Sequence, residues 1–428
     1  MNKKVSFILL IAALILFSSC AVLSFFSITW LTGPLLVSGF ISLAAAVRGF
    51  PAFKGFSYSL WIFTAVTASM FYPRLFLSVG NFELKLLIVP LLQIIMFGMG
   101  SQMSLKDFAG VIKMPKGVIA GVICQYTIMP IMGISVATLF GFPPEIAAGI
   151  VLVGTSPSGL ASNVMSFIAK ANLALSVTLT AFATLLSPLL TPFLMKTLAG
   201  QFIEVNFWDM MLGIFDMVIL PIVAGLLFNI FTLSKIQVKG RIIQIASYFL
   251  IIVLKNFIEF QTTGTTSGVF VKGIFTDTIW FMFLPYAGTI IFNFFARGNR
   301  EWLNKALAFL SMLGIGIIIT IITAAGRDSL LDVGLLLIVA CFIHNMFGYG
   351  LGYSIARFIL KMKEQDCRTI ALEVGMQNGG LASGLALQMG KIATVGLAPA
   401  IFGPMMNITG SSLATWWRNK GETTNQKK

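Results

Sequence analysis

Charged residues are scarce in this chain. Only 10% of its 428 residues are Asp, Glu, Lys or Arg, whereas 57% are apolar. A soluble domain carries about 25% charged residues, so this chain has too little polar surface to cover a globule in water. A water-soluble enzyme or binding module is therefore excluded.

Cysteine and histidine are also scarce. The four cysteines lie far apart, mostly within apolar runs, and the one histidine is His344. Their spacing matches neither a disulfide framework nor a zinc site. Basic residues outnumber acidic ones by 29 to 15, but they lie in short loops without interleaved aromatic residues. This distribution argues against a nucleic-acid partner and is typical of the positive-inside bias of membrane proteins.

Long apolar runs make up most of the chain. Each is close to the ~20 residues that a helix needs to cross a membrane. Because lipid offers no partner to free backbone N–H or C=O groups, we expect these runs to be helices. The predicted fold class is an all-α polytopic membrane protein with about 12–14 helices. The expected helices span 5–28, 31–47, 57–78, 84–104, 117–140, 146–169, 173–197, 210–232, 242–260, 275–296, 304–325, 331–360, 369–390 and 393–416.

The charges of the connecting loops predict the topology. Loops at one end of the expected helices carry basic residues such as Lys3 and Lys170, and loops at the other end carry most of the acids, such as Glu145 and Glu204. The positive-inside rule then predicts a bacterial inner-membrane protein with both termini cytoplasmic. The first apolar run continues past Cys20, so we expect an uncleaved helix there and not a removed leader.

An internal repeat divides the chain. Ser158–Asn163, with the sequence SGLASN, is echoed 221 residues later by Gly379–Gly384, with the sequence GGLASG. Each copy lies within an apolar run and brings helix-weakening residues, among them Pro157 and Gly375. Two interrupted helices at corresponding places in two halves are typical of a transporter binding site.

Glu373 is the main candidate for chemistry inside the membrane. A bare carboxylate there costs at least a few kcal/mol, so it needs a cation, a proton or a basic partner. No Lys or Arg lies in the neighbouring motif, whereas Gln377 is one helical turn away on the same face. Unwound backbone at Val374 and Met376 offers carbonyl oxygens, and oxygen ligands are what a hard cation such as Na⁺ prefers.

Other oxygen-bearing side chains indicate the same chemistry. Ser176 and Thr180 are four residues apart, so two hydroxyls share one helix face. The alternative for such hydroxyls is a hydrogen bond to a carbonyl of their own helix. One cage is predicted from Ser162, Asn163, Ser176, Thr180 and Glu373, and a second from Gln125, Glu373 and Gln377 with the backbone of Val374 and Met376.

The segment Gly154–Leu194, with its motifs SGLASNVMS, ALSVTLT and SPLLTP, resembles the bile acid:sodium symporter family. The motif EVGMQN at Glu373–Asn378 and the motif FGMG at Phe97–Gly100 resemble it too, and the likeness covers roughly 57–235 and 300–417. It implies two inverted five-helix repeats. Each repeat would give two helices to a panel domain and three to a core domain, with two broken helices crossing in the core.

The resemblance also implies a function. In the family, one sodium ion lies among the residues that match the first cage and a second among those that match the second cage. The implied activity is sodium-coupled symport of a small organic anion, bile-acid-like or pantothenate-like, by alternating access, and not an enzymatic reaction. The substrate is expected near Leu160, Asn378 and Asn407. Leu160 and Met406 stand where relatives often have polar residues, which leaves the identity of the substrate open. The oligomeric state is open as well.

Some segments have no counterpart in the ten-helix family core. Asp216 lies in mid-helix near 210–232, where it either faces a cavity or pairs with a lysine such as Lys255. The expected division of the chain is 1–54 for two extra N-terminal transmembrane helices, 55–235 for the first repeat, 236–300 for an inserted helical segment, 301–417 for the second repeat and 418–428 for a cytoplasmic basic tail.

Three other functions fit parts of these patterns. Proton coupling through Glu373 is the nearest alternative, and a passive channel would share the helix breaks. A remote alternative is an intramembrane serine protease that uses Ser158 and His344. That chemistry requires the histidine within hydrogen-bond reach of the serine, and no Gly-x-Ser-Gly motif surrounds Ser158.

Overall fold

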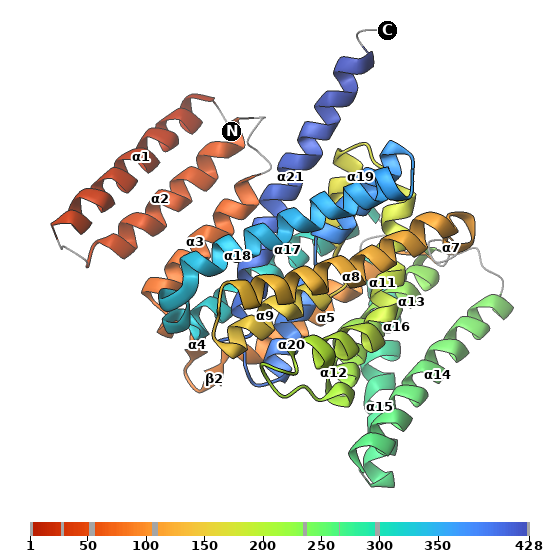
Figure 1. Ribbon diagram of the computed structural model, residues 1–428. Helices are drawn as coiled ribbons and strands as arrows, with labels where there is room; N and C mark the ends of the chain where they lie inside the picture. The colour runs from red at the N-terminus through yellow and green to blue at the C-terminus, as the bar shows by residue number, and fades with distance from the viewer. Residues whose placement is uncertain are drawn as a thin grey trace.

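Helices form almost all of the regular structure in the computed structural model (Figure 1). A short antiparallel hairpin joins β1 (Ser78–Val79) to β2 (Phe82–Glu83). The fold class predicted from the apolar runs, an all-α polytopic membrane protein with two broken, crossing helices, is confirmed. The expected domain boundaries near 54 and 235 lie outside the described residues. The structure describes residues 3–26, 30–50, 56–104, 110–233, 238–264, 266–295 and 300–425.

The expected helices correspond to one described helix each, or to two or three consecutive ones. Four of the expected helices include a five-residue π-helical turn. These turns are η4 (Met195–Ala199), η5 (Phe215–Ile219), η6 (Ile279–Phe283) and η7 (Ile355–Ile359). The helices are α1 (Lys3–Phe25), α2 (Thr32–Ala46), α3 (Ser57–Phe71), α4 (Arg74–Leu77), α5 (Ile88–Gln102), α7 (Gly110–Lys113), α8 (Pro115–Leu139), α9 (Pro144–Thr155), α10 (Leu160–Ile168), α11 (Leu173–Leu194), α12 (Phe207–Ile214), α13 (Leu220–Leu233), α14 (Val238–Thr263), α15 (Ser267–Thr278), α16 (Leu284–Phe295), α17 (Arg300–Ala325), α18 (Arg327–Ser354), α19 (Glu364–Gly375), α20 (Gly379–Gln388) and α21 (Leu397–Asn425).

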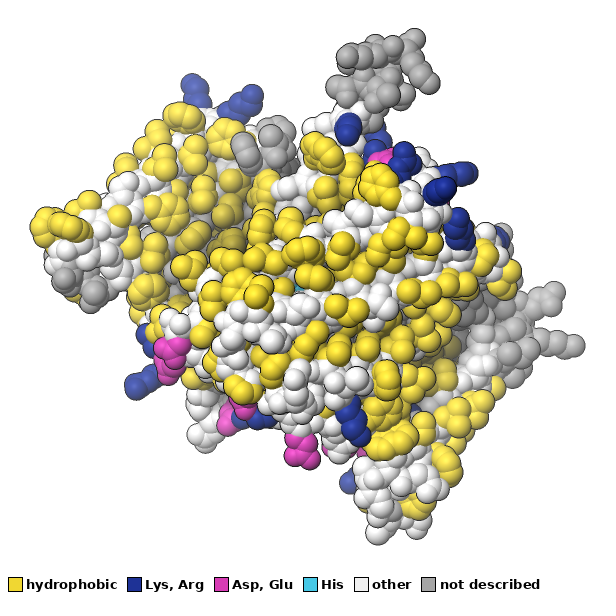
Figure 2. Space-filling view, in the orientation of Figure 1, with side chains coloured by type: hydrophobic (Ala, Val, Ile, Leu, Met, Phe, Trp, Pro, Cys, Tyr) yellow, Lys and Arg dark blue, Asp and Glu magenta, His cyan; other side chains and the backbone are white. Residues whose placement is uncertain are grey.

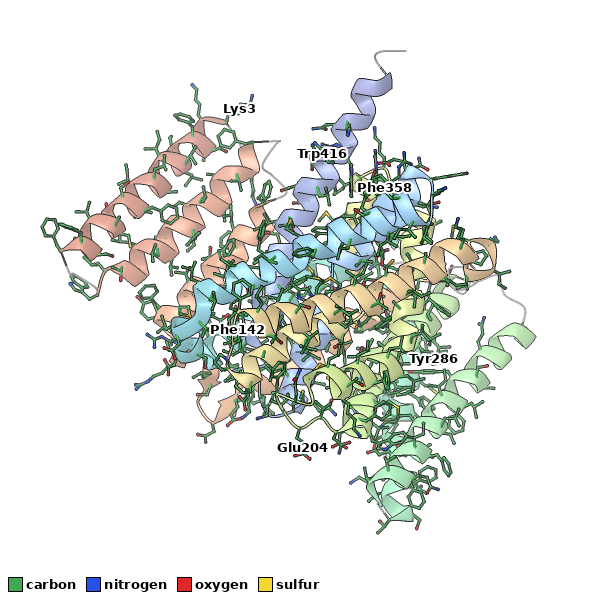
Figure 3. The ribbon with its side chains drawn as sticks, in the orientation of Figure 1. Lys3, Phe142, Glu204, Tyr286, Phe358 and Trp416 are labelled. Atoms are coloured by element: carbon green, nitrogen blue, oxygen red, sulfur yellow. The ribbon has the colours of Figure 1, made fainter. Side chains whose placement is uncertain are left out.

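The surface is that of a membrane protein. Within the described residues, ten helices, counted with their π-helical turns, are long and apolar enough to cross a bilayer. Apolar side chains cover the flanks, whereas charged side chains gather at two opposite ends (Figure 2). Lys3 lies at the end where both termini are found, and Glu204 lies at the other end (Figure 3). A broad apolar belt between two charged rims fits a multi-pass position in lipid.

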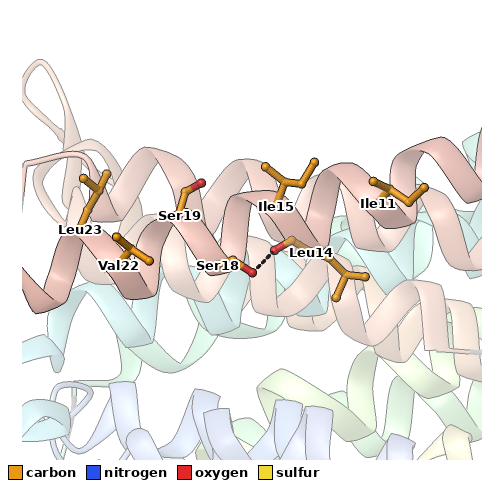
Figure 4. A pocket seen from close by; sticks show the side chains of 7 residues that line it. All are labelled: Ile11, Leu14, Ile15, Ser18, Ser19, Val22 and Leu23. Carbon is orange, nitrogen blue, oxygen red and sulfur yellow. Dashed lines mark hydrogen bonds between the residues drawn. The ribbon is translucent and has the colours of Figure 1, made fainter.

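Helix α1 packs against α2 and turns its other side outward. A shallow hollow on this outer face is lined by residues from Ile11 to Leu23 (Figure 4). Two serines line it, Ser18 and Ser19, and the Ser18 hydroxyl donates to the Leu14 carbonyl oxygen at 2.8 Å within the helix. Lipid chains neither donate nor accept hydrogen bonds, so this internal bond allows the face to lie against them.

Four long segments form a row at one side of the molecule. Helices α13, α5, α17 and α3 pack against one another in that order, and α2 extends the row beyond α3. Close approach within the row requires a glycine. A Cβ atom at Gly100 on α5 would lie 1.9 Å from the carbonyl oxygen of Ile222 on α13. The remaining long helices, α8, α11, α18 and α21, surround the broken pairs α9/α10 and α19/α20.

The inserted helices α14 and α15 attach to the row through a cluster of three carboxylates around a buried lysine. Lys255 on α14 is 5% exposed, and its ammonium group lies 2.9 Å from carboxylate oxygens of both Asp216 and Glu259. A third carboxylate, that of Asp277 on α15, lies at 3.3 Å. The sequence left the partner of Asp216 open, and the structure pairs it with Lys255. Buried charges persist only when they are paired, so this cluster fixes the insertion against η5.

Candidate functional site

Two helices are broken near the middle of the molecule, and the breaks face each other. The first lies between α9 and α10 and the second between α19 and α20. Across the breaks, the Asn378 N–H donates to the Pro157 carbonyl at 2.8 Å and the Gly159 N–H donates to the Met376 carbonyl at 3.3 Å. The two unwound segments are therefore paired like antiparallel strands, with Ser158 opposite Gln377. Backbone groups that lost their helical partners satisfy one another inside the membrane.

Residue type explains why the chain breaks here. Pro157 has no N–H to continue a helix. Gly159 allows the second unwound segment to approach closely, because a Cβ atom there would lie 3.3 Å from the Gln377 carbonyl oxygen. Beyond the second break, the Asn378 side chain accepts a hydrogen bond from the Leu381 N–H at 3.0 Å and caps α20.

The carboxylate of Glu373 lies beside this crossing and is 2% exposed. Among the described residues, no Lys, Arg or His lies within ion-pair distance of it. Its hydrogen-bond partners are instead hydroxyl groups from α10, α11 and the first break. Donor-to-acceptor distances to Glu373 are 2.5 Å from Ser176, 2.6 Å from Ser158, 2.7 Å from Ser162 and 2.9 Å from Thr180.

These hydroxyls have more acceptors within reach than protons to donate. Ser176 also lies 2.8 Å from the Asn163 side-chain oxygen, and Thr180 lies 3.2 Å from the same atom. Ser162 also lies 2.7 Å from the Gly159 carbonyl. Because each hydroxyl carries a single proton, three of the four are shared between two oxygens. The cluster is therefore rich in oxygen acceptors and carries one formal negative charge.

All five residues of the first predicted cage thus lie together in the structure. Ser158 joins them and was not predicted as a ligand. Ser158 directly follows Pro157 in the break, and the sequence suggested it only as a possible nucleophile. In the described part of the chain, no group of three His, Cys, Asp or Glu side chains gathers as in a transition-metal site.

In the second predicted cage, the side chains of Gln125 and Gln377 meet, whereas the printed bonds of Glu373 go to the hydroxyls around the first cage. The Gln125 amide donates to the Gln377 side-chain oxygen at 2.6 Å and to the Ser156 carbonyl at 2.9 Å. The Gln377 amide donates to the Val374 carbonyl at 2.6 Å. The side-chain oxygen of Gln125 is buried and has no hydrogen-bond partner among the residues that the structure describes. This orphan acceptor fits a cation, whereas both Glu373 oxygens are bonded to hydroxyls of the first cage.

The three residues predicted to face the substrate lie around the same crossing. Leu160 begins α10 and is half-buried, and Asn407 is half-buried on α21, which packs against α10 and α20. Asn378 is 6% exposed, and its amide nitrogen lies 4.0 Å from the Met96 sulfur. No hydrogen bond joins Leu160, Asn378 and Asn407 in the described structure.

The serine and histidine proposed for proteolysis do not form a dyad. The Ser158 hydroxyl donates to Glu373. His344 is fully buried, and its Nε2 atom bonds the Met129 carbonyl at 2.9 Å. Within the described part of the chain, the remaining ring nitrogen of His344, Nδ1, has no hydrogen-bond partner. A base that is not bonded to the nucleophile cannot activate it, so this alternative is rejected.

Polar contacts join the ends of the two broken helices at both rims. At the rim opposite the termini, Glu145 in the first turn of α9 pairs with Lys391, just beyond α20. At the other rim, Asn172, just beyond α10, donates to Asp366 in the first turn of α19 at 2.8 Å. Each broken helix is therefore tied to the other at both of its ends.

Comparison with known proteins agrees with this arrangement. The family model described as "Sodium Bile acid symporter family" matches residues 89–258. An uncharacterized sodium-dependent transporter of Bacillus subtilis (strain 168), YocS, is 32% identical over 375 residues, which are 87% of this chain and 94% of that protein. The chain belongs to the sodium bile acid symporter family. The family resemblance inferred from the sequence motifs is confirmed.

Plant relatives extend the likeness. This family member is 31% identical to a probable chloroplastic sodium/metabolite cotransporter of Arabidopsis thaliana, BASS1, over 76% of its own length and 65% of that protein. It is 27% identical to the rice (Oryza sativa subsp. japonica) protein of the same name, over 85% of its own length and 72% of the relative. The protein is therefore a sodium-dependent membrane transporter for a small molecule and not an enzyme.

Proposed function

We propose that this transporter is a sodium symporter that carries a small organic anion by alternating access. The observation that carries the proposal is the carboxylate of Glu373, buried and bonded only to hydroxyl groups that are themselves shared with other oxygens. A buried negative charge without a positive partner is unstable in the membrane. A sodium ion supplies the missing charge and accepts the surplus oxygen atoms as ligands.

Two sodium sites follow from this proposal. The first uses Glu373 and Asn163 with the hydroxyls of Ser162, Ser176 and Thr180, to which we add Ser158. The second uses the orphan oxygen of Gln125 with Gln377 and the backbone of Val374 and Met376. Both proposed sites share Glu373, whose two carboxylate oxygens are bonded to the hydroxyls around the first site. We therefore expect the two ions to bind in a coupled manner.

An anionic substrate would bind where two short helices begin. The N-terminus of α10 at Gly159 has no side-chain cap, and α20 begins beside it. Helix N-termini carry partial positive charge and free N–H groups, which stabilise an anion. The amides of Asn378 and Asn407 would donate further hydrogen bonds, and Leu160 would contact the apolar part of the substrate. This pairing of half-helices at mid-membrane is common among secondary transporters.

Alternating access requires one part of the molecule to move against another. We take the row of α3, α5, α12–α13 and α17 as the panel, and the helices around the crossing as the core. With five helices in each repeat, the first repeat ends at α11 and the second begins at α12 (Phe207–Ile214), before the expected boundary at 235. The inserted helices then lie within the second repeat. The contacts of Glu145 and of Asn172 with the opposite broken helix support a core that moves as one body.

The basic rim supports the proposed orientation. Lys3 lies at the end of the molecule that holds both termini, and Glu204 lies at the opposite end (Figure 3). Under the positive-inside rule, this arrangement supports a bacterial inner-membrane protein with both termini in the cytoplasm. Sodium entering down its gradient would drive uptake of the anion.

The decisive test does not require the substrate. Purified protein is heated in NaCl or KCl of equal ionic strength, and the midpoint of unfolding is compared for the native chain and for Glu373→Gln. We expect sodium to raise the native midpoint over potassium, since a ligand that binds the folded state stabilises it. The variant should lose that difference, and the exposed control Glu204→Gln should keep it. An undiminished sodium effect in Glu373→Gln would sink the proposal.

Proton coupling is the second candidate, because Glu373 also accepts a proton. The surplus of oxygen acceptors favours sodium. A proton on the carboxyl would form one hydrogen bond to one of these acceptors, whereas a sodium ion would bind several of them at once. A substrate is first identified as an organic acid that raises the unfolding midpoint of the purified protein. Uptake of that acid into proteoliposomes is then measured. Uptake driven by a pH gradient in sodium-free buffer would assign coupling to protons. Uptake only with a sodium gradient would assign it to sodium.

A further inference from the structure

A cavity of about 950 Å³ lies outside the proposed transport site, between the N-terminal half of α3 and the middle of α17, from Phe309 to Thr320. Its walls are mostly apolar and aromatic, and include Trp61 on α3 with Phe309 and Leu313 on α17. All three side chains are exposed, although they lie within apolar helices. The Tyr58 hydroxyl donates to the Met312 carbonyl at 3.0 Å and fixes the spacing of the two helices.

One cation lies at the end of this cavity. Arg48 is in η1 (Val47–Gly49), where the second helix of the N-terminal hairpin ends, and its Nε atom donates to the Ser57 hydroxyl at 3.2 Å. In the described part of the chain, no carboxylate pairs with Arg48. Because the segment 32–49 is long enough to span the bilayer, its last residues lie at the depth of the lipid headgroups.

The length of the cavity matches one leaflet of a bilayer. Phe309 and Thr320, the outermost lining residues on α17, are eleven residues apart, which is about 17 Å along a helix. Half of a hydrocarbon core of ~30 Å is similar. The cavity therefore offers apolar walls along the depth of one acyl chain and a guanidinium group at the level of the phosphate.

We propose that α3 and α17, together with Arg48 at the end of the N-terminal hairpin, form a binding site for an anionic phospholipid. The acyl chain lies between Trp61 and Leu313, and the phosphate lies against Arg48. A guanidinium binds phosphate through paired N–H donors, and basic pockets between transmembrane helices bind anionic headgroups. The lining contains no acidic residue that would hold the cationic end of a zwitterionic headgroup. The extra N-terminal helices thereby gain a function that the transport site does not provide.

Two variants test the two halves of the site. Arg48→Gln removes the charge and keeps a polar side chain. Gly316→Leu fills the space for the acyl chain, and this change is tolerated sterically because nothing lies within 4 Å of a Cβ atom at that position. Arg357→Gln is the matched control, since Arg357 is an exposed arginine in η7 at the same rim but outside the cavity.

The experiment measures lipid binding to delipidated, detergent-purified protein without sodium or substrate, so that its result is independent of the proposed symport. Phosphatidylglycerol and phosphatidylcholine with the same acyl chains are compared by native mass spectrometry and by the shift in unfolding temperature. The native chain and Arg357→Gln should prefer phosphatidylglycerol. Arg48→Gln should lose about fivefold in affinity for it, and Gly316→Leu should lose retention of both lipids.

Equal retention of phosphatidylglycerol by the native chain, Arg48→Gln and Gly316→Leu would overturn the proposal. The same spectra report the oligomeric state. If the native protein were a dimer that dissociates in Gly316→Leu, the cavity would belong to a contact between two copies of the chain, and the lipid site would be rejected.

Discussion

Glu145 and Asp366 occupy equivalent places in the two halves of the chain. Each lies in the first turn of a broken helix, and each is bonded to a residue just beyond the other broken helix. They are separated by 221 residues, the same offset that relates Ser158 to Gly379. The internal repeat seen as a short motif therefore extends over the whole crossing, from one rim of the membrane to the other.

Removing the Glu145 contact should make stability less dependent on pH. The hydrogen bond from Lys391, and then that from Thr394, hold the pKa of the Glu145 carboxyl below its usual value. A carboxyl with a lowered folded-state pKa contributes stability above its unfolded pKa of about 4.3, and that contribution disappears as the pH falls through the folded pKa. Because Glu145 is part-exposed, we expect a small effect.

The measurement is the unfolding midpoint between neutral and acidic pH. Native protein should lose more stability on acidification than Glu145→Gln, and the two curves should converge at low pH. Glu204→Gln, an exposed carboxyl at the same rim, should follow the native curve (Figure 3). Parallel curves for native protein and Glu145→Gln would show that the contact contributes nothing.

Ser158→Ala should weaken sodium binding without unfolding the protein. The variant removes one hydroxyl from the Glu373 carboxylate, a bond of 2.6 Å to a charged group. Such bonds contribute about 1.5–3 kcal/mol, so the apparent affinity for sodium should fall roughly tenfold or more. Sodium titration of the unfolding midpoint measures this change. Ser166→Ala is the control, because the Ser166 hydroxyl is buried on α10, the helix after the break, and has no hydrogen-bond partner among the described residues. It should leave sodium binding unchanged.

Gln125→Ala should affect the second proposed ion only. The variant removes the orphan acceptor and the 2.6 Å bond to Gln377. If two ions bind cooperatively, the Hill coefficient for sodium exceeds ~1 in native protein and falls to about 1 in the variant. Isothermal titration with NaCl at constant ionic strength gives this value. A cooperative titration that persists in Gln125→Ala would assign the second ion elsewhere.

Lys255→Met should loosen the inserted helices. It would leave the carboxylates of Asp216, Glu259 and Asp277 without their shared cation inside the membrane layer. Breaking a buried ion pair by removing one partner costs about 3–5 kcal/mol. We expect a lower unfolding midpoint and faster proteolysis between α14 and α15. Lys272→Met, which removes an exposed lysine from α15, should behave like native protein.

Much of the fold could be predicted because the membrane restricts the choices. Apolar runs of sufficient length have to be helices, and Pro157 and Gly375 mark the interruptions. The first cage was predicted because Ser176 and Thr180 share a helix face and Glu373 had no basic neighbour in sequence. Periodicity and burial are local properties, so a sequence reveals them directly.

Features that depend on distant partners could not be derived in the same way. The direction of the Ser158 side chain follows from the pairing of two breaks that are far apart in the chain, so its bond to Glu373 has no local signal. Helix periodicity does not tell which of two nearby oxygen clusters Glu373 faces. Lys255 was only one possible partner for Asp216, because sequence distance does not determine packing between helices.

The crossing is framed by bonds between backbone atoms, chiefly Asn378 N–H to the Pro157 carbonyl and Gly159 N–H to the Met376 carbonyl. Such bonds are indifferent to which side chains project from the neighbouring positions. The half-buried Leu160 could therefore be exchanged without loss of these backbone bonds. Under the proposed function, the substrate preference could then change through a few substitutions while the proposed ion sites are kept.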